Sequence, residues 1–83
     1  LADFDQAVKL RPRDAGALRN RASVLVLKRD FDRALVDLDA SLKIEPRSAE
    51  ALLRRAEIYG ERGDLARMRT DQAAAAALQH AVR

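Results

Sequence analysis

Apolar residues recur along this chain with the spacing of amphipathic helices. Before the polar break formed by Arg29 and Asp30, the apolar residues Leu18, Ala22 and Leu25 are spaced by four and three positions, which places them on one face of a helix. This pattern predicts a helix over residues 15–28. The stretch after the break carries a second apolar stripe, formed by Phe31, Ala34, Leu35, Leu38 and Leu42. The two stripes predict a pair of helices joined by a tight turn.

Capping residues mark the ends of these two helices. Asp14 and Asp30 precede the two stripes, and an aspartate in that position accepts a hydrogen bond from a free backbone N–H group of the first turn. Arg29 and Asp30 form the turn. Pro46 ends the second helix, because the residue before a proline is pushed out of the α region.

The same plan returns 34 residues later. Residues 11–22 read RPRDAGALRNRA and residues 45–56 read EPRSAEALLRRA. A fixed period of this length indicates stacked repeats, each of which cannot bury its apolar face alone. The charged residues matched by the shift include Arg21 with Arg55, Arg33 with Arg67, and Asp37 with Asp71.

The second period predicts two further helices. Ser48 caps a helix over residues 49–61, whose inward face is Leu52, Ala56 and Tyr59. Gly63 can take the left-handed conformation after that helix, and Asp64 caps the next one. Residues 1–10 show an apolar stripe of their own and are expected to form the second helix of a partial repeat. The sequence therefore predicts five helices in one domain of residues 1–83: a partial repeat over 1–14, a full repeat over 15–48 and a terminal repeat over 49–83.

Composition agrees with an all-α fold and excludes some kinds of site. The chain has 83 residues, 35% of them charged, with three glycines and two prolines. It has no cysteine, which excludes disulfides and thiolate metal sites and leads us to expect a cytoplasmic location. No apolar run is long enough to span a bilayer, so we expect no membrane contact. The net charge of +3 is too small to indicate nucleic acid. The chain does not begin with Met, and we expect it to be part of a longer protein.

Paired helices at this period resemble the tetratricopeptide repeat family, and the likeness covers nearly the whole chain. The positions that carry it are a large residue at Leu18 and Leu52, a small one at Ala22 and Ala56, Tyr59 at the aromatic position (Leu25 in the other repeat), Ala34, Leu38, and the closing Pro12 and Pro46. Arg21 and Arg55 depart from it, because they stand where the family has leucine. The resemblance implies an α-solenoid of antiparallel helix pairs with right-handed superhelical stacking. We expect the alkyl stems of the two arginines to cover apolar surface while their charged groups reach water.

Catalysis has little support in this sequence. His80 is the only histidine and is expected on a solvated helix end. No serine or threonine is paired with a base by a known motif, and no glycine-rich phosphate loop or ligand-spaced cluster is present. Asp37 and Asp39 are interpreted as part of a solvated helix face. Ala73–Ala77 are interpreted as a thin ridge that packs close to a neighbouring helix, with a docking face for another chain as the alternative. We therefore expect a protein that is not an enzyme and has no cofactor or metal.

The resemblance also implies a binding surface, because in this family the first helix of each repeat lines a concave groove that holds partner peptides. Carried onto this chain, the peptide-binding positions are Arg19, Asn20, Ser23 and Leu27 from the first full repeat and Glu50, Leu53, Arg54 and Glu57 from the second. Asn20 and Arg54 match positions that grip a C-terminal carboxylate in chaperone-binding members, whereas Glu50 stands where such members have lysine. Ordinary solvated or inter-repeat contacts are the alternative interpretation of both residues.

Three functions follow from these patterns. The first is a protein–protein interaction module that holds a partner peptide or helix in its groove. The second is self-association into a homo-oligomer, since the unpaired first helix would expose Phe4. The third, RNA binding by a related helical-repeat scaffold, is disfavoured because Glu50, Glu57 and Glu61 would oppose a phosphate backbone.

Overall fold

The computed structural model describes residues 14–81, and this part of the chain is all-helical, as predicted. Its four helices are α2 (Ala15–Leu27), α3 (Phe31–Ile44), α4 (Ala49–Glu61) and α5 (Leu65–Ala81). No strand occurs within residues 14–81.

The prediction of five helices was wrong, since the residues that the structure describes form four. The fifth predicted helix, over residues 1–10, lies outside the described residues. That prediction depended only on the apolar period of residues 1–10. Periodicity alone is a weak basis for a helix, because most helical stability in proteins comes from packing against a neighbour.

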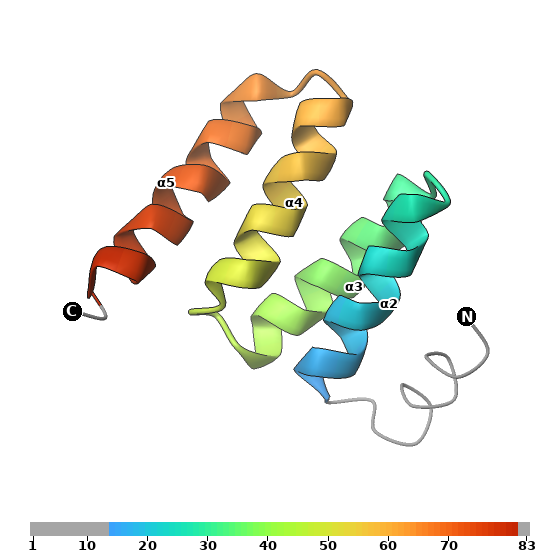
Figure 1. Cartoon of the computed structure of the whole chain (residues 1–83), viewed down its shortest axis with the longest axis horizontal. Helices are drawn as coiled ribbons and strands as arrows, with labels where there is room; N and C mark the ends of the chain where they lie inside the picture. Colours follow the sequence, from blue (N-terminus) through green and yellow to red (C-terminus); the bar gives the residue numbers. More distant parts are fainter. Residues whose placement is uncertain (1–13, 82–83) are drawn as a thin grey trace. The chain divides into compact units, whose positions relative to one another are not determined.

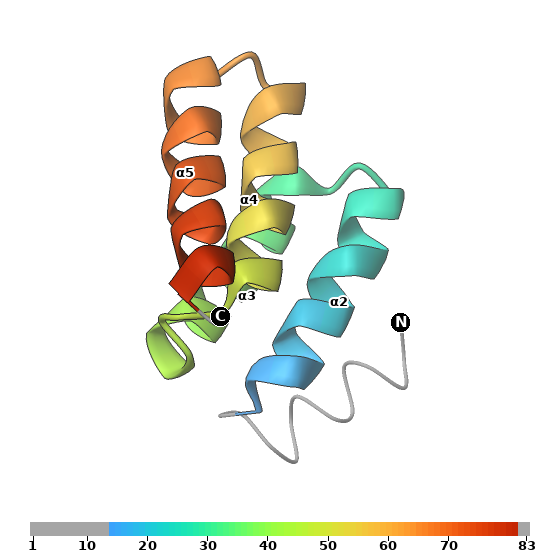
Figure 2. The same cartoon turned by 60° about the vertical axis from the view of Figure 1, so that its left-hand side comes forward.

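Helices α2 and α3 form the first helix pair and run antiparallel (Figures 1 and 2). The predicted inward face of α2 is confirmed, because Leu18, Ala22 and Leu25 are all buried. On α3, Ala34 and Leu38 are fully buried. Ser41 is also fully buried, and its hydroxyl donates to the backbone carbonyl of Ala15 at 3.3 Å. The small side chains let the two helices approach closely.

Helices α4 and α5 form the second helix pair, also antiparallel (Figure 1). Its core contains Ala51, Leu52, Ala56, Ile58 and Ala75, all buried. Within the alanine run of α5, Ala75 is fully buried while its neighbours on both sides are exposed, so one alanine of the run belongs to the core. The contacts of the chain divide it into two compact units, residues 1–46 and 47–83, each containing one helix pair. The stacking of one pair on the other remains a prediction.

The turn between α2 and α3 closes one helix and opens the next. The backbone N–H of Asp30 donates to the carbonyl of Leu25 at 2.8 Å, and that of Arg29 donates to Val26 at 2.9 Å. This is the hydrogen-bond pattern of the Schellman motif, and Arg29 takes the left-handed conformation that it requires, with φ 61°. The side chain of Asp30 then accepts from the N–H of Arg33 as the N-cap of α3.

The turn between α4 and α5 has the same pattern. The N–H of Asp64 donates to Tyr59 at 2.8 Å, and Gly63 occupies the left-handed position with φ 76°. The Asp64 side chain accepts from the N–H of Arg67 at 3.2 Å. Asp14 and Ser48 cap α2 and α4 in the same way. All four predicted N-caps and the predicted role of Gly63 are therefore confirmed.

Candidate functional site

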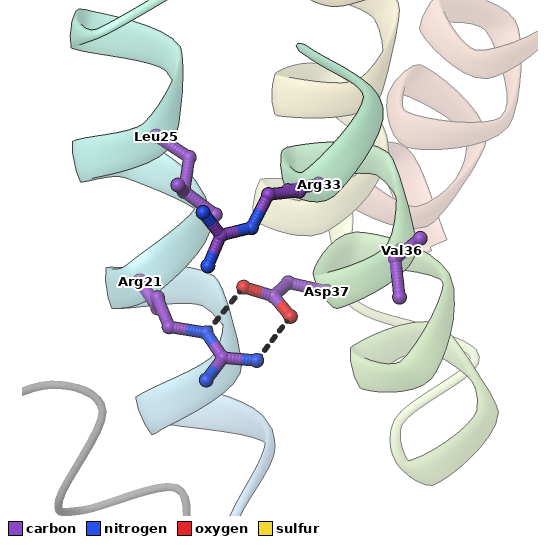
Figure 3. Close-up of a pocket in the computed structure, with 5 residues that line it drawn as sticks. All are labelled: Arg21, Leu25, Arg33, Val36 and Asp37. Carbon is purple, nitrogen blue, oxygen red and sulfur yellow. Dashed lines mark hydrogen bonds and ion pairs between the residues drawn. The ribbon is translucent and has the colours of Figure 1, made fainter. Parts of the chain in front are cut away.

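A buried ion pair joins the two helices of the first pair (Figure 3). Arg21 on α2 donates from Nε to Oδ2 of Asp37 at 2.7 Å and from Nη2 to Oδ1 at 2.6 Å. The Asp37 side chain is 4% exposed and the Arg21 side chain 24%. Two parallel N–H···O bonds to one carboxylate fix both the distance and the orientation of the partners.

The second helix pair repeats this contact. Arg55 on α4 donates from Nε and Nη2 to the two carboxylate oxygens of Asp71 on α5, at 2.8 and 2.9 Å. Asp71 is 4% exposed. In each pair the arginine and the aspartate are 16 positions apart, and the two pairs are related by the 34-residue shift.

These pairs correct two interpretations of the sequence. Asp37 does not lie on a solvated face; it is buried, whereas Asp39 is exposed as expected. The guanidinium groups of Arg21 and Arg55 do not simply reach water, because each meets a buried carboxylate. Both errors came from reading charge as a sign of exposure. The signal that could have corrected them was the joint recurrence of Arg and Asp at one fixed separation in both repeats.

The structure brings together the four predicted binding residues of the second helix pair. Glu50, Leu53, Arg54 and Glu57 line one side of an open hollow of about 370 Å³. Gln79, near the C-terminal end of α5, completes the lining and was not foreseen. We call this hollow the α4 hollow. It combines two carboxylates, a guanidinium, an amide and a leucine that is 40% exposed.

Arg54 carries an unsatisfied hydrogen-bond donor beside the α4 hollow. Its Nη2 lies 3.5 Å from Oε1 of Glu50, a loose ion pair between side chains that are 38% and 56% exposed. Its Nε atom is buried and has no hydrogen-bond partner among the described residues. Leaving a buried donor unpaired costs about 1–3 kcal/mol. A rearrangement that gave this N–H an acceptor would therefore be favourable.

The predicted binding residues of the first helix pair do not form a comparable hollow within that pair. Arg19 is engaged by Glu45, with Nη1 2.8 Å from Oε1. The Ser23 hydroxyl donates to the backbone carbonyl of Arg19 at 3.1 Å. Asn20 is exposed on α2, and Leu27, the last residue of α2, is 83% exposed.

Other kinds of site find little support in the part of the chain that the structure describes. No group of three or more His, Cys, Asp or Glu side chains within residues 14–81 is placed to hold a metal ion. His80 is exposed in the last turn of α5. Among the described helices, none has both the length and the apolar character needed to cross a bilayer.

A scan of the chain against protein-family models finds no match, and a search of curated proteins finds none either.

Proposed function

We propose that the chain is a protein–protein interaction module of the tetratricopeptide repeat type, which binds a segment of a partner polypeptide through the α4 hollow. The observation that supports this best is the α4 hollow itself. Its lining contains all four second-repeat residues that the resemblance assigns to peptide binding. These residues provide both charged and apolar contacts in one open depression.

The lining favours a particular kind of peptide. Glu50 forms an ion pair with Arg54 and Glu57 is exposed, so the hollow has one carboxylate more than it has guanidinium groups. A lysine or arginine of the partner would complement Glu57, and an apolar side chain would cover Leu53. The N–H groups of Arg54 could donate to a backbone carbonyl of the peptide after a change of rotamer. We therefore propose a partner segment in which a basic residue lies next to an apolar one.

A displayed peptide library tests this proposal directly. Peptides retained by the chain should be enriched in a basic residue adjacent to an apolar residue. For an enriched peptide, calorimetric titration of Glu57→Gln and Arg54→Ala should show weaker binding, by about 5- to 20-fold, as expected when one charged or hydrogen-bonded contact is lost.

Leu53→Ala tests the apolar contact of the α4 hollow, and Leu65→Ala is its matched control. Leu65 is 50% exposed, similar to Leu53, but does not line the α4 hollow. Only Leu53→Ala should weaken binding. A library with no enrichment, or full affinity in Arg54→Ala and Glu57→Gln, would contradict the proposed site.

Self-association is a second candidate, favoured by exposed apolar side chains. Leu27, Val36 and Leu65 are 83%, 67% and 50% exposed. Burial of such surface between copies would be favourable at about 25 cal/mol per Å². Light scattering across a hundredfold range of concentration tests this candidate, and a constant monomer mass would exclude it.

A further inference from the structure

The two helix pairs share a cluster of charged residues but differ in what lies beside it. In the second pair, Tyr59 lies beside the Arg55–Asp71 ion pair. The guanidinium carbon of Arg55 lies over the Tyr59 ring, 6.0 Å from its centroid, and that of Arg67 lies 5.8 Å from the same centroid. Both distances are within the range of cation–π attraction. This ring is therefore shared by two arginines, one from each helix.

The first helix pair has the two arginines but not the ring. Arg21 and Arg33 stand at the positions of Arg55 and Arg67, and Leu25 stands where the second pair has Tyr59. At this place the structure has a hollow of about 150 Å³, lined by Arg21, Leu25, Arg33, Val36 and Asp37 (Figure 3). We call it the Leu25 hollow. The shorter side chain leaves open a space whose equivalent is occupied by an aromatic ring 34 residues later.

We propose that the Leu25 hollow binds an aromatic side chain, tyrosine or phenylalanine, of a partner polypeptide. Its volume of about 150 Å³ equals that of a cavity that binds benzene in another protein, but this hollow is open and lined partly by charged groups, so a guest ring would be held at its edge by the two arginines. Val36 is 67% exposed and offers an apolar contact that a guest ring would remove from water, whereas Leu25 lines the hollow but is 2% exposed. The occupied equivalent in the second pair shows how two guanidinium groups at these positions accommodate a ring.

The electrostatics of the Leu25 hollow also select the guest. Asp37 accepts two short hydrogen bonds from Arg21, which leaves Arg21 well fixed and reduces the attraction of the carboxylate for another cation. Arg33 is held more loosely, since its Nη1 is 3.5 Å from Asp30 and its side chain is 68% exposed. Two guanidinium groups disfavour a lysine guest and attract the negative face of a ring. A small anion is the competing guest, and the experiment distinguishes it.

NMR titration of methyl groups tests the proposal with defined probes. N-acetyl-tyrosinamide and N-acetyl-phenylalaninamide should shift the Leu25 and Val36 methyl signals in a saturable manner, in the millimolar range expected for a single side chain. N-acetyl-leucinamide should give shifts at least fivefold smaller. Inorganic phosphate should neither saturate these signals nor compete with the aromatic probes. No saturable aromatic shift, an equal response to the leucine probe, or displacement by phosphate would overturn the proposal.

Two reciprocal variants place the binding at this hollow. Leu25→Tyr supplies a ring at the position of Tyr59 and should abolish the response of Val36 to the aromatic probes. Tyr59→Leu should open a second hollow and double the number of probe molecules bound. An unchanged Val36 response in a folded Leu25→Tyr variant would overturn the proposal.

A third variant avoids changes to the core. Arg33→Gln leaves the buried Arg21–Asp37 pair intact and should weaken aromatic binding by about 3- to 10-fold, equivalent to the energy of one cation–π contact. Arg69→Gln, an exposed arginine outside the hollow, is its control and should have no effect. Full binding in Arg33→Gln would overturn the role of the two arginines.

One ring of the chain itself, that of Phe4, must be distinguished from a partner's ring. Phe4 lies outside the described residues. If the Leu25 methyl signals of the chain alone already carried a ring-current shift that Phe4→Leu removed, the chain itself would fill the hollow and the proposal would fail. The inference does not rest on the α4 hollow, because different residues line it and different variants test it.

Discussion

Replacing the members of the Arg21–Asp37 pair one at a time should have unequal effects on stability. Arg21→Met keeps most of the alkyl stem but leaves the carboxylate of Asp37 without its guanidinium. Asp37→Leu keeps the guanidinium but removes the carboxylate to which it donates two hydrogen bonds. In the intact pair the Asp37 side chain, which the first variant leaves behind, is 4% exposed, and the Arg21 side chain, which the second leaves behind, is 24% exposed. The two variants therefore differ in how readily water can reach the charge that is left behind.

The magnitudes follow from that difference. Breaking a buried ion pair from one side costs about 3–5 kcal/mol, and we expect Arg21→Met to lower the free energy of unfolding by about 3 kcal/mol. Asp37→Leu should cost less, about 1–2 kcal/mol, because the guanidinium can be rehydrated in part. The double variant leaves no unpaired charge, and replacement of a buried pair by apolar residues is often close to neutral, so its cost should be within about 1 kcal/mol.

Urea denaturation followed by circular dichroism measures all three variants. The sum of the single costs should exceed the cost of the double variant by about 3 kcal/mol, which is the coupling expected between groups in direct contact. Arg69→Met, at an exposed position, controls for loss of an arginine. Equal costs for the two single variants, or a double variant whose cost is the sum of both, would refute the reasoning.

Two further predictions concern the turn and the helix contact. Gly63→Ala should lower the free energy of unfolding by about 1 kcal/mol because its φ is 76° and no atom lies near the added Cβ, so that backbone strain is the whole cost. Arg29→Gly should raise it by about 0.5 kcal/mol, since the loss of the 5.1 Å contact between the Arg29 guanidinium and the Phe31 ring offsets part of the gain. Thermal melts measure both variants, and a stabilised Gly63→Ala or a destabilised Arg29→Gly would contradict the shared turn geometry. Ala22→Leu should lower the free energy of unfolding by about 1–3 kcal/mol, because Ala22 is fully buried between α2 and its partner. Ala76→Leu, at an exposed position, is the control and should change it little. Equal melting temperatures for the two variants would show that the helix crossing lies elsewhere.

The sequence predicted the helices of the described residues well, because local chemistry decides where they begin and end. Aspartate is a residue type preferred at N-caps, as at Asp30 and Asp64, and glycine adopts the left-handed conformation easily, as at Gly63. Each role could therefore be assigned without knowing which other helices pack nearby. Arg29 was predicted to lie in the turn, but its left-handed φ was not predicted, because an arginine does not favour that conformation.

The contacts made by long polar side chains were harder to predict. The burial of Asp37 depends on Arg21, 16 residues away on another helix, and no local pattern shows that the two meet. The position of Gln79 was difficult to predict for the same reason, because its place in the α4 hollow depends on where the end of α5 lies beside α4. The four lining residues from α4 itself were foreseen because the family resemblance assigns binding to the first helix of each repeat.

Asp30 and Asp64 each have two roles, and these roles fix the length of the turn between the paired helices. In each turn one residue terminates the outgoing helix through its amide and starts the incoming helix through its carboxylate. An inserted residue would assign these two tasks to different side chains, and both helix ends would be disturbed together. Residues can therefore be added or lost only at the far ends of the two helices. Because the turn has a constant length, it fixes which residues of one helix lie opposite which residues of the other.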